Sequence, residues 1–557
     1  MTAAEQADTV EHVVEQADVA DQADVAEQAD VVIVGGGPVG LMLACELRLS
    51  DVPVVLLERL PAPTGESRAL GLHSRTVEVL DQRGLLAAVD DKVPVWPKGH
   101  FAGMRKVDMT KLDAEHSYAL MVPQSRTEQI LLDRALELGA NVRRGHHLVS
   151  LESPRTEDLD TADAVEFEAE DPDGRRYRLR SRFLVGCDGG SSTVRKLAGI
   201  PFPGTASTVN AVLGDVRLLG EQPKVRELLR VRGGQLGIIP LGEGLFRVIA
   251  VEFDTDPVPR DVPVTPQEIA DTVRRVSDLE LKVGEARWMS RFGNATRLVD
   301  NYRRGPILLA GDAAHVHFPA GGQGLNTGVQ DALNLGWKLA GVLRGWAPET
   351  LLDTYESERR PVAKRVCMNT RAQLALMHPA DEITPLRDLF SELMDLEQVN
   401  RYLGEMIAGL DIRYPMTARS ETEPPKAPAL PNADDAPTPV HDLVGRRMRP
   451  LHLTTNKGPT TVTALLREGR GILLDLTADA SDNTSHNTDL AALAKPRTDR
   501  LTYVPAALAD DEKYPAPELV LVRPDGYVAW TGTAATADTD GLPEALDTWF
   551  GTVPTTS

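Results

Sequence analysis

The chain has 557 residues, which is enough for about three domains, and its 42% apolar and 25% charged content is ordinary for a soluble globular protein. Its formal net charge of −22 argues against nucleic acid or an anionic membrane as a partner. Three widely spaced cysteines, Cys45, Cys187 and Cys367, fit a reducing cytoplasm and exclude a disulfide framework or a cysteine zinc site.

Residues 1–29 form an acidic leader that repeats Glu-Gln-Ala-Asp and Asp-Gln-Ala-Asp and contains neither Lys nor Arg. The six-residue spacing fits no regular apolar face, so we expect this leader to be disordered. It also lacks the basic and apolar regions of a signal peptide. No apolar run in the chain reaches about 18 residues, so the sequence predicts a cytoplasmic protein without a membrane span.

A nucleotide-binding pattern follows the leader. The apolar run 31–34 is typical of a buried parallel strand and leads into Gly-x-Gly-x-x-Gly at Gly35, Gly37 and Gly40. In this pattern the first glycine permits a tight turn, the second lets the backbone approach a pyrophosphate, and the third allows close packing of helix and strand. A helix over 41–49 and a strand over 52–57 come next. That strand ends at Glu58, whose carboxylate suits a ribose diol and would repel a 2′-phosphate, so the pattern indicates FAD or NAD.

Residues 30–200 are expected to be the first part of this nucleotide-binding domain. Asp171 to Gly174 is a turn sequence that predicts a hairpin between its neighbouring strands. The strand over 183–187 ends, like the first, in an acid and a glycine, Asp188 and Gly189. We expect helices over 74–84 and 125–138, and strands over 141–151, 164–170, 175–180 and 183–187.

The pattern changes at residue 201. Short alternating runs over 209–216, 235–240 and 245–253, with one helix over 266–276, predict an antiparallel sheet domain at 201–294 that covers the substrate. A parallel strand returns at 306–310, and helices continue to about residue 410, so 295–413 is read as the second part of the nucleotide-binding domain. Residues 414–440 are rich in Pro, Ala and Asp and predict a linker. A small α/β domain is expected over 441–557.

Two further motifs indicate that the nucleotide is FAD rather than NAD. One is Asp188-Gly-Gly-Ser-Ser-Thr-Val-Arg195, and the other is Gly311-Asp312-Ala-Ala-His315, which continues into the loop from Pro319 to Asn326. The second motif brings a carboxylate to the C-terminal end of a strand, where an open α/β sheet binds ligands. That carboxylate can accept from a ribityl hydroxyl, and the glycine-rich loop before a helix can lie against a flat, anionic ring.

Together the three motifs, GxGxxG, DGxxSxxR and GDAAH…PAGGQGLN, closely resemble the class A flavin monooxygenases of the para-hydroxybenzoate hydroxylase fold. The stretches GESRALGLHSRT, NTGVQDALNLGWK and VRPDGYVAW resemble the aromatic polyketide hydroxylases within that family, such as those of angucyclines and anhydrotetracycline. The resemblance implies a Rossmann-like FAD-binding domain, an inserted antiparallel-sheet substrate domain and a thioredoxin-like C-terminal domain. That last domain contains no cysteine, so we expect it to be structural.

The mechanism implied by the resemblance uses two cofactors and O2. NADPH reduces FAD, oxygen adds to C4a of the flavin, and the hydroperoxide transfers a hydroxyl group to a polycyclic aromatic polyketide, in antibiotic biosynthesis. Two alternatives stay open: a Baeyer–Villiger oxygenase acting on a similar substrate, and a non-catalytic binder of a flat aromatic compound. The substrate, the position oxidised and the oligomeric state are left open, with a homodimer as one alternative.

The resemblance also assigns roles to individual residues. The catalytic loop would contribute backbone groups of Pro319, Gly322 and Gly324 around the flavin and oxygen. No metal site is expected, and no catalytic base is singled out. The cofactor-binding residues would be Gly35, Gly37, Pro38, Val39, Gly40, Glu58, Arg59, Arg68, Gln124, Asp188, Gly311, Asp312, Pro319, Gly322, Gly324, Leu325 and Asn326.

Several of these residues have a second interpretation. Arg68 could form only a surface ion pair, and Arg195 is expected to brace the Asp188 turn rather than contact a ligand. His315 and His317 alternate on an extended segment, but no third metal ligand accompanies them. The large side chains Trp96, Trp288, Met289 and Phe292 could line a substrate cleft or belong to the ordinary core.

Overall fold

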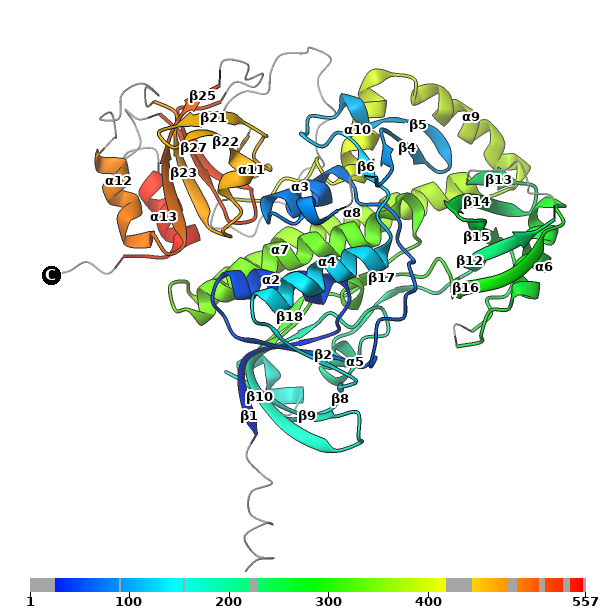
Figure 1. The fold of residues 1–557 in the computed structure, drawn as a ribbon, viewed down its shortest axis with the longest axis horizontal. Coiled ribbons are helices and arrows are strands. Elements are labelled where there is room, and N and C mark those ends of the chain that lie inside the picture. Colours follow the sequence, from blue (N-terminus) through cyan, green and yellow to red (C-terminus); the bar gives the residue numbers. More distant parts are fainter. Residues whose placement is uncertain are drawn as a thin grey trace, which may run out of the picture.

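The computed structural model shows a central α/β body, an antiparallel sheet domain to its right and a C-terminal domain to its left in Figure 1. Most of the expected leader and most of the expected linker fall outside the described residues. The structure describes residues 26–89, 92–153, 156–220, 228–259, 261–416, 443–477, 488–509, 516–533 and 541–553.

Five parallel strands form the centre of the body, in the spatial order β19-β10-β1-β2-β7. The side chains from Val31 to Ile33 have no exposed surface, as expected of a parallel strand covered on both faces. Antiparallel strands β18, β8 and β9 extend this sheet. The bounds are β1 Glu27–Val34, β2 Val54–Glu58, β7 Asn141–Arg144, β8 His147–Ser153, β9 Val165–Glu170, β10 Arg176–Gly186, β18 Arg303–Arg304 and β19 Ile307–Leu309.

Three sequence expectations for strands need correction. The first strand begins at Glu27, so the expected boundary between leader and domain falls inside β1. The strands expected over 175–180 and 183–187 are one continuous strand, β10, because its first half pairs with β9 and its second half with β19. The strand expected over 141–151 is instead two strands, β7 and β8, since the chain turns at Gly145 with φ 79°.

Helices cover the parallel sheet, and the long helix α7 is buried along nearly its whole length. It packs against α2, and at Gly336 a side chain is excluded because a Cβ there would lie 2.4 Å from the Cβ of Glu46. The helices of the body are α2 Pro38–Leu49, α3 Ser74–Gln82, α4 Gln124–Glu137, α5 Thr193–Leu197, α7 Gln323–Leu343, α8 Asp353–Met377, α9 Thr384–Leu393 and α10 Glu397–Ala408. None of the helices in the described ranges combines the length and apolar character needed to cross a membrane.

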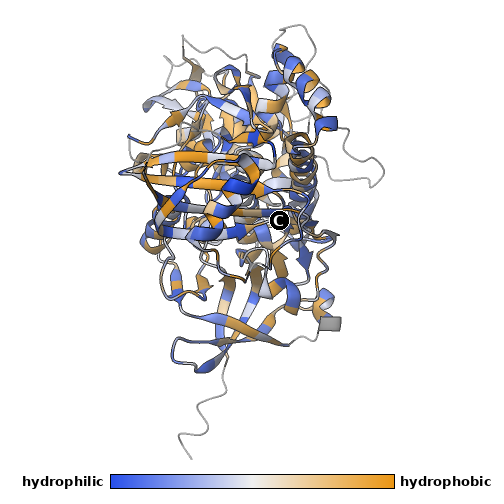
Figure 2. Cartoon of the chain, turned by 90° about the vertical axis from the view of Figure 1, so that its right-hand side faces the viewer, coloured by the Kyte–Doolittle hydropathy of each residue, from blue (hydrophilic) through white to orange (hydrophobic). Residues whose placement is uncertain are grey.

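The domain on the right of Figure 1 is a five-stranded antiparallel sheet in the order β13-β14-β15-β12-β16. Apolar and polar residues are mixed along its strands (Figure 2). Helix α6 (Pro266–Ser277) packs against one face, while the other face turns toward the body. The bounds are β12 Asn210–Leu219, β13 Leu229–Val231, β14 Gly234–Gly242, β15 Leu245–Glu252 and β16 Lys282–Phe292, of which β13 and β16 were not predicted from the sequence.

A second apolar cluster joins this sheet to the body. It contains Phe101 of the β4–β5 hairpin, Val251 of β15, Phe318 of the glycine-rich loop and Met377 of α8. The short strands around it are β3 Val95–Trp96, β4 Lys98–Phe101, β5 Met104–Asp108, β6 Ala119–Leu120, β11 Gly204–Thr205, β17 Thr296–Leu298 and β20 His315–Val316.

The C-terminal domain has a four-stranded sheet in the order β24-β23-β26-β27, in which only β23 and β24 are parallel. A smaller sheet, β22-β21-β25, lies beside it. The bounds are β21 His452–Thr455, β22 Gly458–Thr461, β23 Gly471–Asp475, β24 Leu501–Pro505, β25 Ala507–Leu508, β26 Leu519–Val522, β27 Val528–Gly532, α11 Val462–Leu465, α12 Thr488–Ala494 and α13 Leu542–Phe550.

A buried charge network joins the C-terminal domain to the body; we call it the clamp and define it as Arg523, Asp525, Glu358 and Lys338. Arg523 forms a bidentate pair with Glu358 at 2.7 and 2.8 Å and also contacts Asp525 at 2.5 Å. Lys338 of α7 lies 2.8 Å from the same Glu358 carboxylate. Burial lowers the pKa of Lys338 to about 8, whereas the two cations overcome burial and lower the pKa of Glu358 to about 2.

Candidate flavin site

The N-terminal glycine motif forms a tight turn at the ends of two parallel strands. Gly35 has φ 112°, and a Cβ there would lie 2.4 Å from the carbonyl oxygen of Cys187 at the end of β10. A Cβ at Gly40 would lie 2.0 Å from the Gly35 oxygen, so both positions require glycine. Gly37, at the start of α2, has no atom within 4 Å of its Cβ position, and Pro38 follows it as the first helical residue. The turn is therefore open only in front of Gly37.

Glu58 lies beside this turn, at the end of β2. One carboxylate oxygen accepts from the Gly36 N–H at 2.6 Å and the other from the Leu60 N–H at 2.8 Å. Arg59 is exposed at the same edge. Glu58 therefore also shapes the glycine turn, in addition to its predicted role toward a ribose.

The second motif packs directly on the first through the Cys187 contact. Its acid, Asp188, accepts from the Ser192 hydroxyl at 2.5 Å and from the Thr193 N–H at 2.6 Å, so the carboxylate caps α5. Arg195 donates to the carbonyl oxygens of Gly190 and Ala313 at 3.0 and 2.8 Å. The expectation that Arg195 braces this turn is confirmed, and the same side chain ties the turn to the third motif.

The third motif follows β19 and also touches the first. Gly311 has φ 61°, and a Cβ there would lie 2.9 Å from Val39 of α2. Asp312 is exposed and forms no hydrogen bond or ion pair with the described residues, so its carboxylate is available to a ligand. Its Oδ1 lies 3.9 Å from the Cβ position of Gly324, at the start of α7.

Buried charges behind the third motif hold it in place. Asp331 of α7 accepts from the Gly311 N–H at 3.1 Å and pairs with His315 at 2.8 Å and Arg359 at 2.7 Å. His315 is therefore engaged in the core. Asp331 and Arg359 were not predicted, because nothing in a single sequence shows that α7 and α8 bring these two side chains together in the core.

The glycine-rich loop leads from Pro319 into α7. Gly321 and Gly322 have φ values of 70° and 67°, a conformation that favours glycine. Asn326 fixes the end of this loop by donating to the carbonyl oxygens of Gly71 and Gly322 at 3.0 and 2.8 Å. Leu325 is half-buried beside it. Asn326 is thus a bridge between the loop and the segment that follows Arg68.

The loop containing Arg68 is held from two sides. Gln124 accepts from the Ala69 N–H at 3.2 Å, and Arg247 of the antiparallel sheet donates to the Arg68 carbonyl oxygen at 3.2 Å. The Arg68 side chain itself is 64% exposed and pairs with Glu66 at 3.2 Å, which is the second interpretation given above. Gln124 acts in this structure as a tether of the loop.

His73 lies next to the glycine-rich loop and is 6% exposed. Its N–H donates to Asn326 at 2.8 Å, and its ring lies 3.6 Å from the Cβ position of Gly322. Burial lowers the pKa of His73 to about 4, so the imidazole is neutral at pH 7. His73 was not predicted as a site residue, because nothing in the stretch GESRALGLHSRT distinguishes this histidine from an ordinary core residue.

A pH dependence of stability follows from this neutral histidine. Below about pH 6.5 the unfolded chain protonates His73, whereas the folded chain does so only near pH 4, so stability is lost as the pH falls through this window. We expect about 1.4 kcal/mol of loss per pH unit from this residue. The unfolding midpoint, measured between pH 7 and 5, should fall less steeply in His73→Gln than in the wild type. Equal slopes would contradict the assignment.

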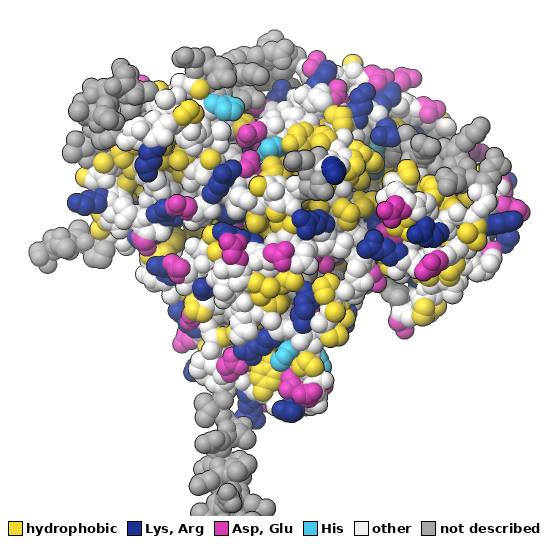
Figure 3. Space-filling model, viewed as in Figure 1, with side chains coloured by type: hydrophobic (Ala, Val, Ile, Leu, Met, Phe, Trp, Pro, Cys, Tyr) yellow, Lys and Arg dark blue, Asp and Glu magenta, His cyan; other side chains and the backbone are white. Residues whose placement is uncertain are grey.

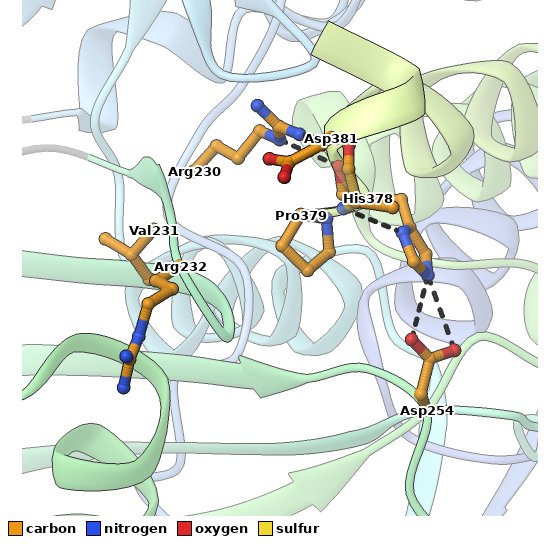
Figure 4. A pocket seen from close by; sticks show the side chains of 8 residues that line it. Arg230, Val231, Arg232, Asp254, His378, Pro379 and Asp381 are labelled. Atoms are coloured by element: carbon orange, nitrogen blue, oxygen red, sulfur yellow. Dashed lines mark hydrogen bonds and ion pairs between the residues drawn. The ribbon is translucent and has the colours of Figure 1, made fainter.

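The cavity shown in Figure 4 lies elsewhere. It has a volume of about 500 Å³ and is bounded by the β13–β14 hairpin and the segment after α8. His378 pairs there with Asp254 at 3.3 Å, and Arg230 donates to the His378 carbonyl oxygen at 2.7 Å. The cavity contains none of the predicted site residues.

Figure 3 shows acidic and basic side chains interspersed over the visible face, so this face has no large patch of one charge.

Strand ends, glycine turns and the available carboxylate of Asp312 lie together at the C-terminal edge of a parallel sheet, where open α/β sheets bind their ligands. The chain matches the FAD binding domain family over residues 28–370 and the aromatic-ring hydroxylase C-terminal family over 441–553. It belongs to the FAD-binding family and is an FAD-dependent aromatic monooxygenase.

Two relatives and one solved structure show which proteins this chain is similar to. The 12-dehydrotetracycline 5-monooxygenase/anhydrotetracycline 6-monooxygenase of Streptomyces rimosus is 42% identical, covering 94% of this chain and 98% of the relative. The solved structure of CabE, an aromatic hydroxylase from angucycline biosynthesis, is 43% identical with a TM-score of 0.80, covering 94% of this chain and 99% of that chain. The dialkyldecalin synthase of Streptomyces rugosporus is 38% identical, covering 94% of this chain and 98% of the relative.

Proposed function

We propose that this protein hydroxylates a planar polycyclic aromatic polyketide in antibiotic biosynthesis, with FAD as its resident cofactor, NADPH as reductant and O2 as co-substrate. When bound, FAD supplies the oxygen-activating chemistry, and the protein binds, orients and excludes water. The names of the tetracycline monooxygenase and CabE support the substrate class. The antiparallel sheet domain is assigned to the substrate and the parallel-sheet body to FAD.

The observation that carries this proposal is that three distant motifs meet at one edge of the parallel sheet. Gly35 touches Cys187, the residue before Asp188, and Val39 touches Gly311, the residue before Asp312. The strands that precede these motifs, β1, β10 and β19, are neighbours in one sheet. A single extended ligand with a pyrophosphate and a polyol fits such an arrangement, whereas three unrelated structural turns would have no reason to meet.

Individual roles follow from the contacts. We assign the pyrophosphate to the open space at Gly37, the adenosine ribose to Glu58 and the ribityl chain to Asp312. The backbone from Pro319 to Asn326 is assigned to the flavin ring. Asp188 and Gln124 would act indirectly, because both side chains already hold neighbouring loops.

The C-terminal domain is assigned a thioredoxin-like fold and a structural role. Its strand order β24-β23-β26-β27, with one parallel pair followed by a hairpin, supports the fold. It contains no cysteine, so it has no thiol redox chemistry. The clamp supports the structural role, because Arg523 of the stretch VRPDG binds Glu358 of the body and so fixes the C-terminal domain to it.

The test is a product assay. The purified protein should oxidise NADPH faster when anhydrotetracycline or an angular aromatic polyketide is added, and one atom of labelled O2 should enter an intact ring. A lactone would instead select the Baeyer–Villiger alternative. Tight ligand binding without NADPH oxidation would select a non-oxidative role, an alternative that the name of the dialkyldecalin synthase also supports.

One prediction concerns Asp312 directly. Asp312→Ala should weaken FAD binding about tenfold, because a ribityl hydroxyl would lose a charged acceptor worth about 1.4 kcal/mol. The dissociation constant can be measured from the change in flavin fluorescence. The control is Asp300→Ala, whose exposed carboxylate lies near Arg360 at 3.6 Å, and which should bind FAD like the wild type. Wild-type affinity in Asp312→Ala would contradict the ribityl assignment.

A further inference from the structure

The face of the antiparallel sheet that turns toward the body is built from three rows of side chains. One end row contains Arg247, Asp215 and Trp288, and Arg247 reaches the Arg68 loop. The other end row contains Ala211 and Phe292. Both end rows are therefore in contact with the FAD-binding body, one through Arg247 and the other through the ring of Phe292, 5.9 Å from that of Phe318.

The middle row lies between these two contacts. It consists of Gly237, Ile249, Leu213 and Ser290, which are direct cross-strand neighbours on four successive strands. Ile249 and Ser290 remain partly exposed between the contacts that Arg247 and Phe292 make with the body. Leu228 already covers Gly237 at one end of the row, where a Cβ would lie 3.4 Å from its side chain, so the row forms a mainly apolar floor that ends at Ser290; we call it the platform.

Ser290 is the only polar side chain of the platform. Its direction is fixed by its neighbours on β16: Trp288 donates to Asp215 on the body side, whereas Met289 and Arg291 pack toward α6. The Ser290 hydroxyl is partly exposed and makes no hydrogen bond within the described ranges of the chain. An accessible hydroxyl without a partner, set in an apolar floor, suits an oxygen substituent of a flat ligand.

We propose that Ser290 is a positioning residue that hydrogen-bonds a phenol or carbonyl oxygen of a planar polycyclic substrate lying on the platform. This inference rests on the proposed function and makes it more specific: the substrate must carry an oxygen substituent above Ser290 while its rings cover Leu213 and Ile249. The hydroxyl sets the rotation of the ring system in its plane and hence which carbon faces the flavin loop.

Anhydrotetracycline is the probe for the test. With FAD-loaded Ser290→Ala, its dissociation constant, measured by flavin fluorescence, should rise about 5- to 10-fold. The share of NADPH consumed as hydrogen peroxide rather than product should also rise, because a rotated substrate accepts oxygen less efficiently. Ser277→Ala is the matched control: its hydroxyl is bonded to the Val273 carbonyl oxygen at the end of α6, and both quantities should keep their wild-type values.

Gly237→Ala provides a second, independent variant. Its new methyl group would lie 3.4 Å from Leu228 and 3.7 Å from Ile249, both ordinary contacts, so the fold should be retained while the space beside Ile249 becomes narrower. We expect weaker anhydrotetracycline binding at unchanged FAD content. Binding within twofold of wild type in both variants would overturn the inference while leaving the proposed function intact. A wild-type protein that binds neither anhydrotetracycline nor an angular aromatic polyketide would overturn both.

Discussion

Arg523→Ala should yield protein that is largely insoluble or unfolds far below the wild-type midpoint. The substitution leaves the carboxylates of Glu358 and Asp525 buried with only Lys338 as a nearby cation of the clamp. Breaking a buried pair by removing one partner destabilises by about 3–5 kcal/mol, a large fraction of the stability of an ordinary domain. The measurement is the soluble yield and the thermal unfolding midpoint.

The matched control for the clamp is Arg274→Ala. Arg274 also pairs with a carboxylate, that of Asp271 at 2.7 Å, but its side chain is 60% exposed. Solvent screens such a pair, so its loss should lower the free energy of unfolding by less than about 1 kcal/mol. If Arg523→Ala unfolds within a degree or two of Arg274→Ala, the clamp does not hold the C-terminal domain on the body. Removing residues 441–557 takes away Arg523 and Asp525, leaves Glu358 and Lys338 without their cover, and should also give insoluble protein.

Gly37→Ala should fold normally and bind FAD at least a hundredfold more weakly. Its φ of −79° suits any residue, and its Cβ position has no neighbour within 4 Å, so the apoprotein accommodates the methyl group. That vacant space is where the pyrophosphate is assigned, and a methyl group there would prevent the backbone N–H groups from reaching it. The measurement compares the unfolding midpoint of the apoprotein with the FAD dissociation constant.

Gly40→Ala is the informative counterpart. Its Cβ would lie 2.0 Å from the Gly35 carbonyl oxygen, so this substitution should destabilise the fold whether or not FAD is present. The two variants thus distinguish a glycine that leaves room for the ligand, Gly37, from a glycine that is required for packing, Gly40. Normal FAD binding by Gly37→Ala would show that the pyrophosphate does not lie against this turn.

The buried parallel strands could be predicted because Val31 to Val34 form a continuous apolar run followed by glycines with defined spacing. Strand β16 could not, since its sequence KVGEARWMSRF alternates irregularly and includes four charged residues. Long-range ion pairs could not be predicted either, because Glu358 and Arg523 are 165 positions apart and meet only through the packing of two domains. The stretch VRPDG resembles the family in sequence, but only the structure shows that its Arg523 and Asp525 form part of the clamp.

Within the site, the sequence predicted which motifs meet but not which atoms are free. Asp188 and Asp312 follow strands in the same way, yet the first caps α5 and the second has an available carboxylate. The difference arises because the Ser192 hydroxyl and the Thr193 N–H donate to the Asp188 carboxylate, whereas no such donors follow Asp312 within the described residues. Of the four large side chains named at the outset, Trp288 and Phe292 face the body, whereas Met289 packs on the α6 side.

The central claim is that three distant motifs surround one FAD that serves oxygen transfer. The most direct test is to titrate the purified apoprotein with FAD and then follow NADPH oxidation under ¹⁸O₂ with anhydrotetracycline. We predict a yellow one-to-one complex, substrate-stimulated NADPH oxidation and one labelled oxygen atom in the product. A protein that takes up no FAD, or one that takes it up and transfers no label to anhydrotetracycline or to an angular aromatic polyketide, would contradict this account.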